Sequence, residues 1–235
     1  MKQRIWELDA FRGICVLGMI AVHFVYDLTS LYRLVDWTLP ETFLFVQKWG
    51  GVLFLLLSGI CVTLGKRSVR RGLIVLGSGL LVSAVTFGMW KFFSYQKGII
   101  IYFGVLHCLG VCMMLYPLFK KSHWGVLLGI GAALVAAGFA LMRVTFSFPW
   151  LIPLGLRPER FQSSDYFPLL PYFGFFLLGA ALGKTLYRNQ TSLLPKGNPN
   201  NLIVRFLTGC GRHSLWIYLL HQPVLSGLLY LLSAF

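Results

Sequence analysis

The sequence is poor in charged residues, and above all in acidic ones. Only 12% of its 235 residues are charged, and 7 Asp and Glu stand against 21 Lys and Arg. A soluble domain carries about 25% charged side chains. This low fraction, with a mean hydropathy of +0.74, excludes an ordinary soluble enzyme, a disordered tail and a coiled coil. It indicates an integral membrane protein.

Cysteine is also scarce, and its number is odd. An odd count, with most members in or beside apolar runs, predicts no disulfide framework. The five are Cys15, Cys61, Cys108, Cys112 and Cys210. The net charge of +14 would suggest nucleic-acid binding in a soluble chain, but here the basic residues lie between apolar runs. That pattern is typical of loops that set membrane topology, so we expect no nucleic-acid partner.

Long apolar runs are what the sequence does contain. Runs of about 20 residues predict membrane-spanning helices, and their combined length leaves no room for a separate soluble domain. We therefore expect one all-α domain over 1–235, a polytopic bundle of about seven spans. The predicted spans are 12–32, 44–64, 72–90, 99–119, 124–142, 167–187 and 214–233.

The loops predict an orientation. Most Lys and Arg fall at the N-terminus and in the loops on the same side as it, so the positive-inside rule places the N-terminus in the cytoplasm of a multi-pass cell-membrane protein. Residues 189–213 interrupt the apolar pattern. Within them 201–210 is too short to span and could form an interfacial helix.

The first span contains ionisable residues, which are costly in hydrocarbon and therefore indicate function. Arg12 and His23 are 11 residues apart, so at about 100° per residue they share a helix face about 16.5 Å apart. Asp27 follows His23 by one turn. We predict that Asp27 accepts a hydrogen bond from one imidazole nitrogen and leaves the other as a general base. The alternatives are a topology anchor at Arg12 and a packed, hydrogen-bonded His23.

Two further histidines lie in predicted spans. His221 precedes Pro223, whose missing N–H predicts a kink lined by protein or water. His107 stands beside Cys108 and near Cys112, but the spacing provides no fourth ligand, so we predict no metal site. Packing alone also accounts for either histidine.

Several segments resemble a known family. They are RIWELDAFRGICVLGMIAVHFVYDL at 4–28, FLLLSGIC at 54–61, GVLHCLGV at 104–111, DYFPLLPYFGFFLLGAALGK at 165–184 and GRHSLWIYLLHQP at 211–223. Together they resemble the heparan-α-glucosaminide N-acetyltransferase catalytic-domain family of transmembrane acyltransferases. The separation of Arg12 from His23 is also similar to the Arg-x10-His spacing of the acyltransferase-3 superfamily.

The resemblance implies transfer of an acyl group, acetyl above all, from cytoplasmic acyl-CoA to a hydroxyl or amine of an extracytoplasmic, sugar-containing acceptor. His23 with Asp27 would be catalytic, either by direct transfer or through an acyl-histidine, and no permanently bound cofactor is expected. Basic residues match the phosphates of CoA. The predicted donor-binding residues are Arg12, Arg67, Arg70, Arg71, Arg212 and His107. The predicted acceptor-binding residues are His221 and Asp165, although Asp165 could instead cap a helix beginning at Tyr166.

The sequence departs from the family at one point. The lysosomal branch is longer and places its proposed catalytic histidine in the outer loop after the first span, whereas 32–42 contains none here. The histidine inside the first span is therefore favoured. Other functions stay open: a small proton-coupled transporter using the same polar residues, or a non-catalytic membrane subunit. A homodimer is a possible assembly.

Overall fold

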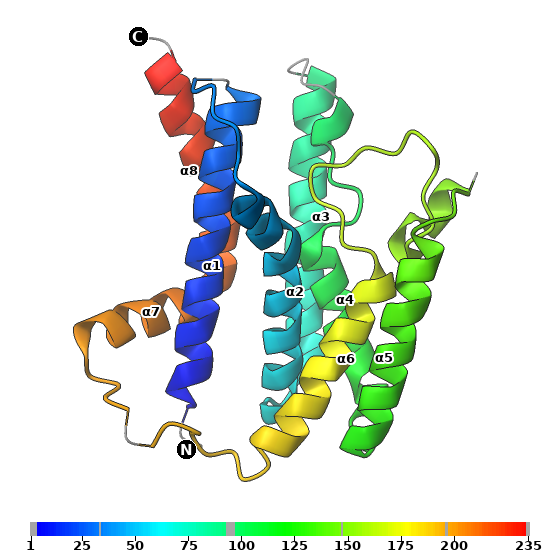
Figure 1. The fold of residues 1–235 in the computed structure, drawn as a ribbon, viewed down its shortest axis with the longest axis vertical. Coiled ribbons are helices and arrows are strands. Elements are labelled where there is room, and N and C mark those ends of the chain that lie inside the picture. The colour runs from blue at the N-terminus through cyan, green and yellow to red at the C-terminus, as the bar shows by residue number, and fades with distance from the viewer. Residues whose placement is uncertain (1–3, 33, 93–96, 147, 196, 234–235) are drawn as a thin grey trace. The chain divides into compact units, whose positions relative to one another are not determined.

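The structure is a computed structural model that describes residues 4–32, 34–92, 97–146, 148–195 and 197–233, and these residues fold mainly into helices (Figure 1). The α-helices are α1 (Trp6–Tyr26), α2 (Glu41–Leu64), α3 (Ser68–Phe92), α4 (Val105–Phe119), α5 (Trp124–Leu141), α6 (Leu169–Leu186), α7 (Leu202–Arg212) and α8 (Ser214–Ser233). Short turns are a π-helix, η1 (Asp27–Leu31), and two 3-10 helices, η2 (Lys97–Ile99) and η3 (Pro149–Leu154).

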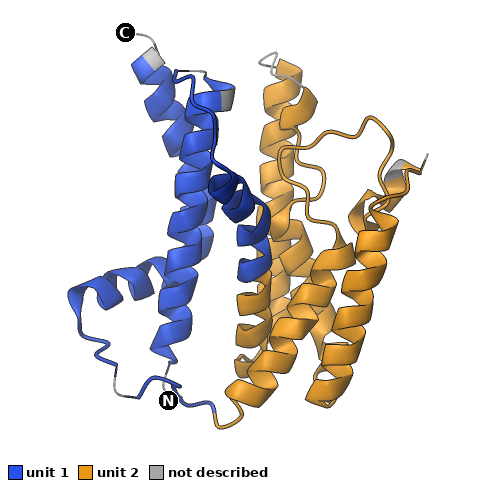
Figure 2. Cartoon of the chain, viewed as in Figure 1, with its two compact units in different colours: residues 1–54, 190–235 blue, residues 55–189 orange. Residues whose placement is uncertain are grey.

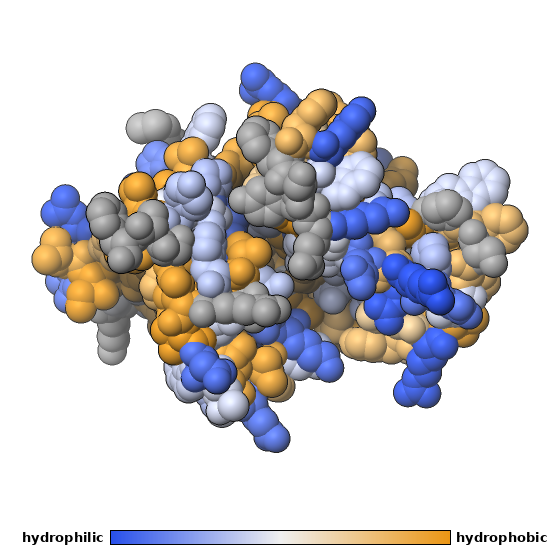
Figure 3. Space-filling model, turned by 90° about the horizontal axis from the view of Figure 1, so that it is seen from above, coloured by the Kyte–Doolittle hydropathy of each residue, from blue (hydrophilic) through white to orange (hydrophobic). Residues whose placement is uncertain are grey.

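Among the described residues, 6 helices are long and apolar enough to cross a membrane, and α4 is a shorter apolar helix of 15 residues. The predicted polytopic helical bundle is therefore confirmed. The apolar surfaces of these helices are largely left open. Only 6% of the apolar window of α8 and 17% of that of α3 is buried inside the protein, which is the pattern expected of lipid-facing helices. The view from above shows hydrophilic and apolar residues intermixed on this face of the protein (Figure 3).

The chain divides into two compact units (Figure 2). The first comprises residues 1–54 and 190–235, and contains α1, η1, the first part of α2, α7 and α8. The second comprises residues 55–189, with the rest of α2 and helices α3 to α6. Each unit is described by itself below.

Helix α1 is the centre of the first unit, with α7, α8 and η1 packed on it. Two glycines let α1 and α7 approach at backbone distance. A Cβ at Gly211 would meet the Asp9 carbonyl, and one at Gly13 would meet the Leu207 carbonyl. Small residues serve this purpose where helices cross closely in membranes.

In the second unit α5 packs along α6 and α3 along α4. The largest fully buried side chains there include Phe176, Leu127 and Leu177. Glycines again allow close contact, since a Cβ at Gly179 would meet the Leu56 carbonyl of α2. The second half of α2 is thereby held against α6.

The fourth predicted span begins later than expected. We predicted a helix over 99–119, but 100–104 is not helical and α4 starts at Val105. The apolar run folds instead against the end of α3, where the Ile101 amide donates to Thr86 and the Ser83 hydroxyl donates to the Ile101 carbonyl. Hydropathy does not separate such a segment from a helix, because both are apolar. At the N-terminus the error is opposite, since α1 begins at Trp6 rather than at residue 12.

The contact of α1 with α7 yields a stability prediction. Replacing Gly211 with Ala should destabilise the protein by about 1–3 kcal/mol, because the added methyl group overlaps the Asp9 carbonyl and forces a backbone shift. The measurement is thermal unfolding of the purified protein in detergent. Gly209, on the same helix with open space at its Cβ position, is the matched control. Its change to Ala should be neutral or stabilising. Equal losses at both positions would show that the close contact is unimportant.

Candidate functional site

The polar residues predicted in the first span meet residues of α8 inside the first unit. His23 lies in the last turn of α1, and Asp27 opens the π-helix that follows. The ring of His23 contacts the ring of His221 edge to face, with centroids 4.9 Å apart and an interplanar angle of 85°. The structure thus brings together two histidines 198 positions apart that the sequence assigned to separate roles.

The geometry at His221 defines its neutral tautomer. Its Nδ1 is hydrogen-bonded to the Tyr218 carbonyl oxygen. A carbonyl oxygen only accepts, so Nδ1 donates and the lone pair of the neutral ring is on Nε2. The side chain is 8% exposed, and Nε2 has no hydrogen-bond partner among the described residues. A buried, unpartnered imidazole nitrogen is an available proton acceptor.

Asp27 is held by a residue that the sequence interpretation missed. Its side chain is 1% exposed, and its Oδ2 accepts a hydrogen bond of 2.7 Å from Gln222 Nε2. The other polar atom of this amide, Gln222 Oε1, is buried and has no hydrogen-bond partner among the described residues. The predicted direct bond from His23 to Asp27 is absent from the hydrogen bonds of the described residues, where Asp27 is bonded to Gln222 instead. The available signal was an amide in an apolar helix, next to His221.

Asp27 is the first residue of the π-helix η1, which continues α1 towards α8. A π turn widens the helix, and such turns are frequent at functional sites. Its end is fixed to α8, where the Tyr32 hydroxyl donates to the Ser226 carbonyl at 3.1 Å. The four polar side chains His23, Asp27, His221 and Gln222 therefore form one cluster between two apolar helices. We call it the histidine cluster.

The arginines of the first unit differ in their surroundings. Arg212 Nε lies 3.4 Å from Asp9 Oδ2, and the Arg212 side chain is 46% exposed. The Arg212 guanidinium, which we predicted to bind the acyl donor, is therefore paired with a carboxylate at the surface. Arg12 is partly buried in the second turn of α1, 11 positions before His23. Its predicted role in donor binding stays a prediction.

The other predicted donor residues lie in the second unit, at the turn between α2 and α3. Arg67 and Arg70 are exposed, and Arg67 has the left-handed φ of 64° that makes the turn. Arg71 is partly buried, with its guanidinium where a Cβ on Gly65 would be. Donor binding by these three residues is untested.

His107 has a structural role in the second unit, and its predicted contact with the donor stays a prediction. It is buried, its Nδ1 accepts from the Gly104 amide at 3.2 Å, and its Nε2 lies 3.3 Å from the Ser83 hydroxyl. Since Nδ1 accepts, the neutral ring carries its proton on Nε2 and donates to Ser83. Both ring nitrogens are thereby used within the second unit. His107 caps its own helix, which the sequence interpretation did not anticipate.

Asp165 also caps α4, from a distant part of the chain. Its Oδ2 accepts from the Val105 amide at 2.9 Å, at the first residue of that helix. A carboxylate is favoured there because it satisfies an unpaired amide and the positive end of the helix dipole. The predicted alternatives were acceptor binding and capping of a helix beginning at Tyr166. Acceptor binding stays a prediction, and the second alternative is wrong because α6 begins at Leu169.

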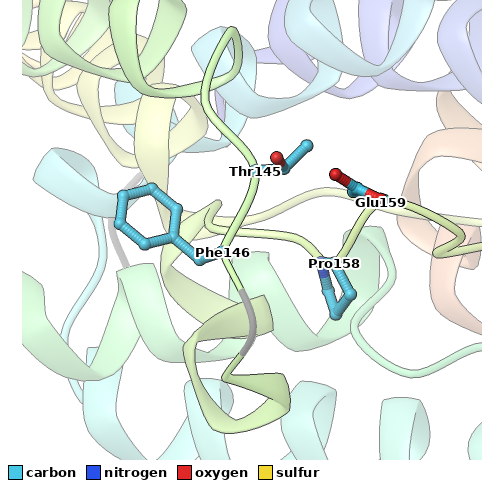
Figure 4. Close-up of a pocket in the computed structure, with 4 residues that line it drawn as sticks. All are labelled: Thr145, Phe146, Pro158 and Glu159. Carbon is cyan, nitrogen blue, oxygen red and sulfur yellow. The ribbon is translucent and has the colours of Figure 1, made fainter.

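The segment between α5 and α6 contains a hollow of about 230 Å³, lined by Thr145, Phe146, Pro158 and Glu159 (Figure 4). None of the predicted site residues lines it. Nearby, the Tyr166 hydroxyl donates to the Ile152 carbonyl, and burial raises the pKa of Tyr166 to about 12. This phenol is therefore neutral at physiological pH and serves as a fixed hydrogen-bond donor.

The described part of the chain contains no group of three or more His, Cys, Asp or Glu residues that could bind a metal ion. Cys108 and Cys112 have their sulfur atoms 3.8 Å apart and are free thiols, as are Cys15 and Cys210.

Apolar spanning helices around a buried cluster of ionisable groups define a polytopic membrane protein with an internal polar site. Comparison with protein families gives the class. The model of the heparan-alpha-glucosaminide N-acetyltransferase catalytic region matches residues 4–223, and the chain belongs to this family. The match extends over both compact units. Comparisons with curated proteins and with solved structures gave no significant match. The family implies a membrane enzyme of the acetyltransferase type.

The cap at α4 predicts the behaviour of an Asp165 variant. Replacing Asp165 with Ala should lower the free energy of unfolding by about 1 kcal/mol, because the Val105 amide loses its acceptor. Thermal unfolding in detergent measures this loss. Glu159 to Ala, an exposed change in the same connection, should leave stability unaltered. An Asp165 variant with unchanged stability but without activity would contradict the capping role and favour acceptor binding.

Proposed function

We propose that this protein is a membrane acyltransferase that moves an acyl group, most simply acetyl, from acyl-CoA to a hydroxyl or amine of a sugar-containing acceptor. The observation that carries the proposal is the unpartnered Nε2 of His221, buried against His23. The family of the chain supports an acetyltransferase reaction, and the cluster supplies the proton acceptor that such a reaction needs.

In the proposed reaction His221 Nε2 removes the proton of the acceptor O–H or N–H as that atom attacks the thioester carbonyl. A new C–O or C–N bond forms, the C–S bond breaks, and the departing CoA thiolate takes the proton from the imidazolium. The Nδ1 bond to Tyr218 stabilises the protonated ring, since a carbonyl accepts from it in both states. This assigns proton transfer to His221, which the sequence interpretation had placed with the acceptor.

His23, the base predicted from the sequence, acts with His221 in this proposal. The two rings are in edge contact, so a positive charge on one disfavours a positive charge on the other. Asp27 holds the amide of Gln222, the residue that follows His221 on α8. Two neutral imidazoles in an apolar environment form a suitable general-base pair.

The donor is proposed to enter from the side of the N-terminus, which we take to be cytoplasmic. CoA carries phosphate groups, and guanidinium groups bind phosphates through paired charge-assisted hydrogen bonds. Arg12 is suited to this role, because it lies on the helix that carries His23 and shares its face at about 16.5 Å. Arg67, Arg70 and Arg71 are further candidates for phosphate contact.

Substitution of the histidines tests the reaction. His221 to Ala and His23 to Ala should each lower kcat by about 10²–10⁴, the usual contribution of a general base. The measurement is transfer of labelled acetyl from acetyl-CoA to glucosamine by the purified protein in nanodiscs. His213, an exposed histidine between α7 and α8, is the matched control, and its change to Ala should leave kcat unchanged. Normal transfer by a folded His221 variant would refute the proposed base.

Substitution of Arg12 tests donor binding separately. Arg12 to Ala should raise the KM for acetyl-CoA about 10-fold or more with little change in kcat, since a charge-assisted bond contributes about 1.5–3 kcal/mol. Arg12 to Lys should recover part of the affinity, and the exposed Arg160 to Ala should have no effect. A fall in kcat at constant KM would instead place Arg12 in the chemical step.

A further inference from the structure

Helix α7 exposes a large apolar surface that neither spans a membrane nor faces α1. Leu202, Ile203 and Phe206 are 80%, 68% and 60% exposed. At about 100° per residue they fall within one arc of about 100° on the helix. In a soluble protein such a surface would require a protein partner, but here the neighbouring helices of the unit are membrane spans.

A second side of α7 is committed to α1. Thr208 and Gly211 are buried, and Gly211 lies against the Asp9 carbonyl. Asn201 fixes the beginning of the helix by accepting a hydrogen bond from the Ile203 amide at 2.9 Å. The rotation of α7 about its own axis is therefore set, and its apolar arc is held away from α1.

A third side carries two arginines seven positions apart, which at about 100° per residue share a stripe. Arg212 is bonded to Asp9, whereas Arg205 is exposed and its guanidinium has no hydrogen-bond or ion-pair partner among the described residues. The stripe adjoins the exposed apolar arc. Arg205 is thus a free positive charge beside an unpartnered apolar surface.

The direction of α7 matches this division. Figure 1 shows α7 extending to one side of α1 at a steep angle, and the two helices meet at Asp9 and Gly13 in the N-terminal part of α1. Since α1 crosses the membrane, a helix at a steep angle to it runs along the membrane plane. An amphipathic helix in that position buries its apolar side among acyl chains and places its basic side among headgroups.

We propose that α7 is a membrane-surface helix that binds anionic phospholipid, with Ile203 and Phe206 among the acyl chains and Arg205 on the headgroup phosphate. Charge complementarity favours anionic over zwitterionic lipid, because the protein has a net charge of +14 and the Arg205 guanidinium has no acidic partner. The neighbouring apolar arc favours a lipid over a soluble phosphate compound. This inference is independent of acyl transfer.

The charge is tested by lipid retention in native mass spectrometry of the full-length protein from bilayers of phosphatidylcholine and phosphatidylglycerol. Arg205 to Gln should lower phosphatidylglycerol retention about fivefold, which corresponds to about 1 kcal/mol per basic residue near a membrane surface. Arg160 to Gln, an exposed change in the connection before α6, should lower it by less than twofold. Equal retention by the Arg205 variant and the unaltered protein would overturn the proposal.

The apolar side is tested by replacing Phe206 with the photoreactive p-benzoylphenylalanine in nanodiscs. A covalent adduct with phospholipid is expected, and cross-linking to a second copy of the chain would show that protein covers this surface instead. Coenzyme A added to phosphatidylcholine nanodiscs separates the two phosphate sources. Thermal stabilisation by coenzyme A that disappears in the Arg205 variant would make the site a nucleotide site and overturn the proposal.

Discussion

The hydrogen bond between Asp27 and Gln222 is the interaction on which the histidine cluster depends. A carboxyl group with 1% of its surface exposed, in a chain this apolar, is costly unless a polar group satisfies it. The amide of Gln222 does so at 2.7 Å, and the bond joins the end of α1 to the middle of α8. Once these two points are joined, His23 and His221 are close enough for their rings to touch. Loss of the bond would leave two buried polar groups unpaired and separate the rings.

The family places this chain among enzymes of the acetyltransferase type, and the histidine cluster is the proton acceptor that we propose for it. An apolar environment favours neutral imidazole, which is the form that accepts a proton. A tautomer fixed by one backbone carbonyl makes a single nitrogen available. These properties follow from the positions of Tyr218 and His221 one turn apart on α8. They require no residue from outside the first unit.

Much of the architecture was predictable from the sequence, because spanning helices need long apolar runs and bilayers leave few alternatives. Arg12, His23 and Asp27 were identifiable because ionisable residues are rare in such runs. Gln222 was missed because it is uncharged, although its amide bonds to Asp27. His107 and Asp165 were assigned to ligands, yet both satisfy amides at the start of α4. Capping by a residue 60 positions away is a tertiary contact, and no local pattern encodes it.

The junction of α7 and α8 connects the contact between α7 and α1 to the helix that contains His221. A single residue, His213, separates the two helices, so the position of α7 determines where α8 begins. Helix α7 packs closely on α1 at Gly13 and Gly211, and His221 lies two turns after the start of α8. The close packing of α7 against α1 therefore also sets the position of His221 beside His23.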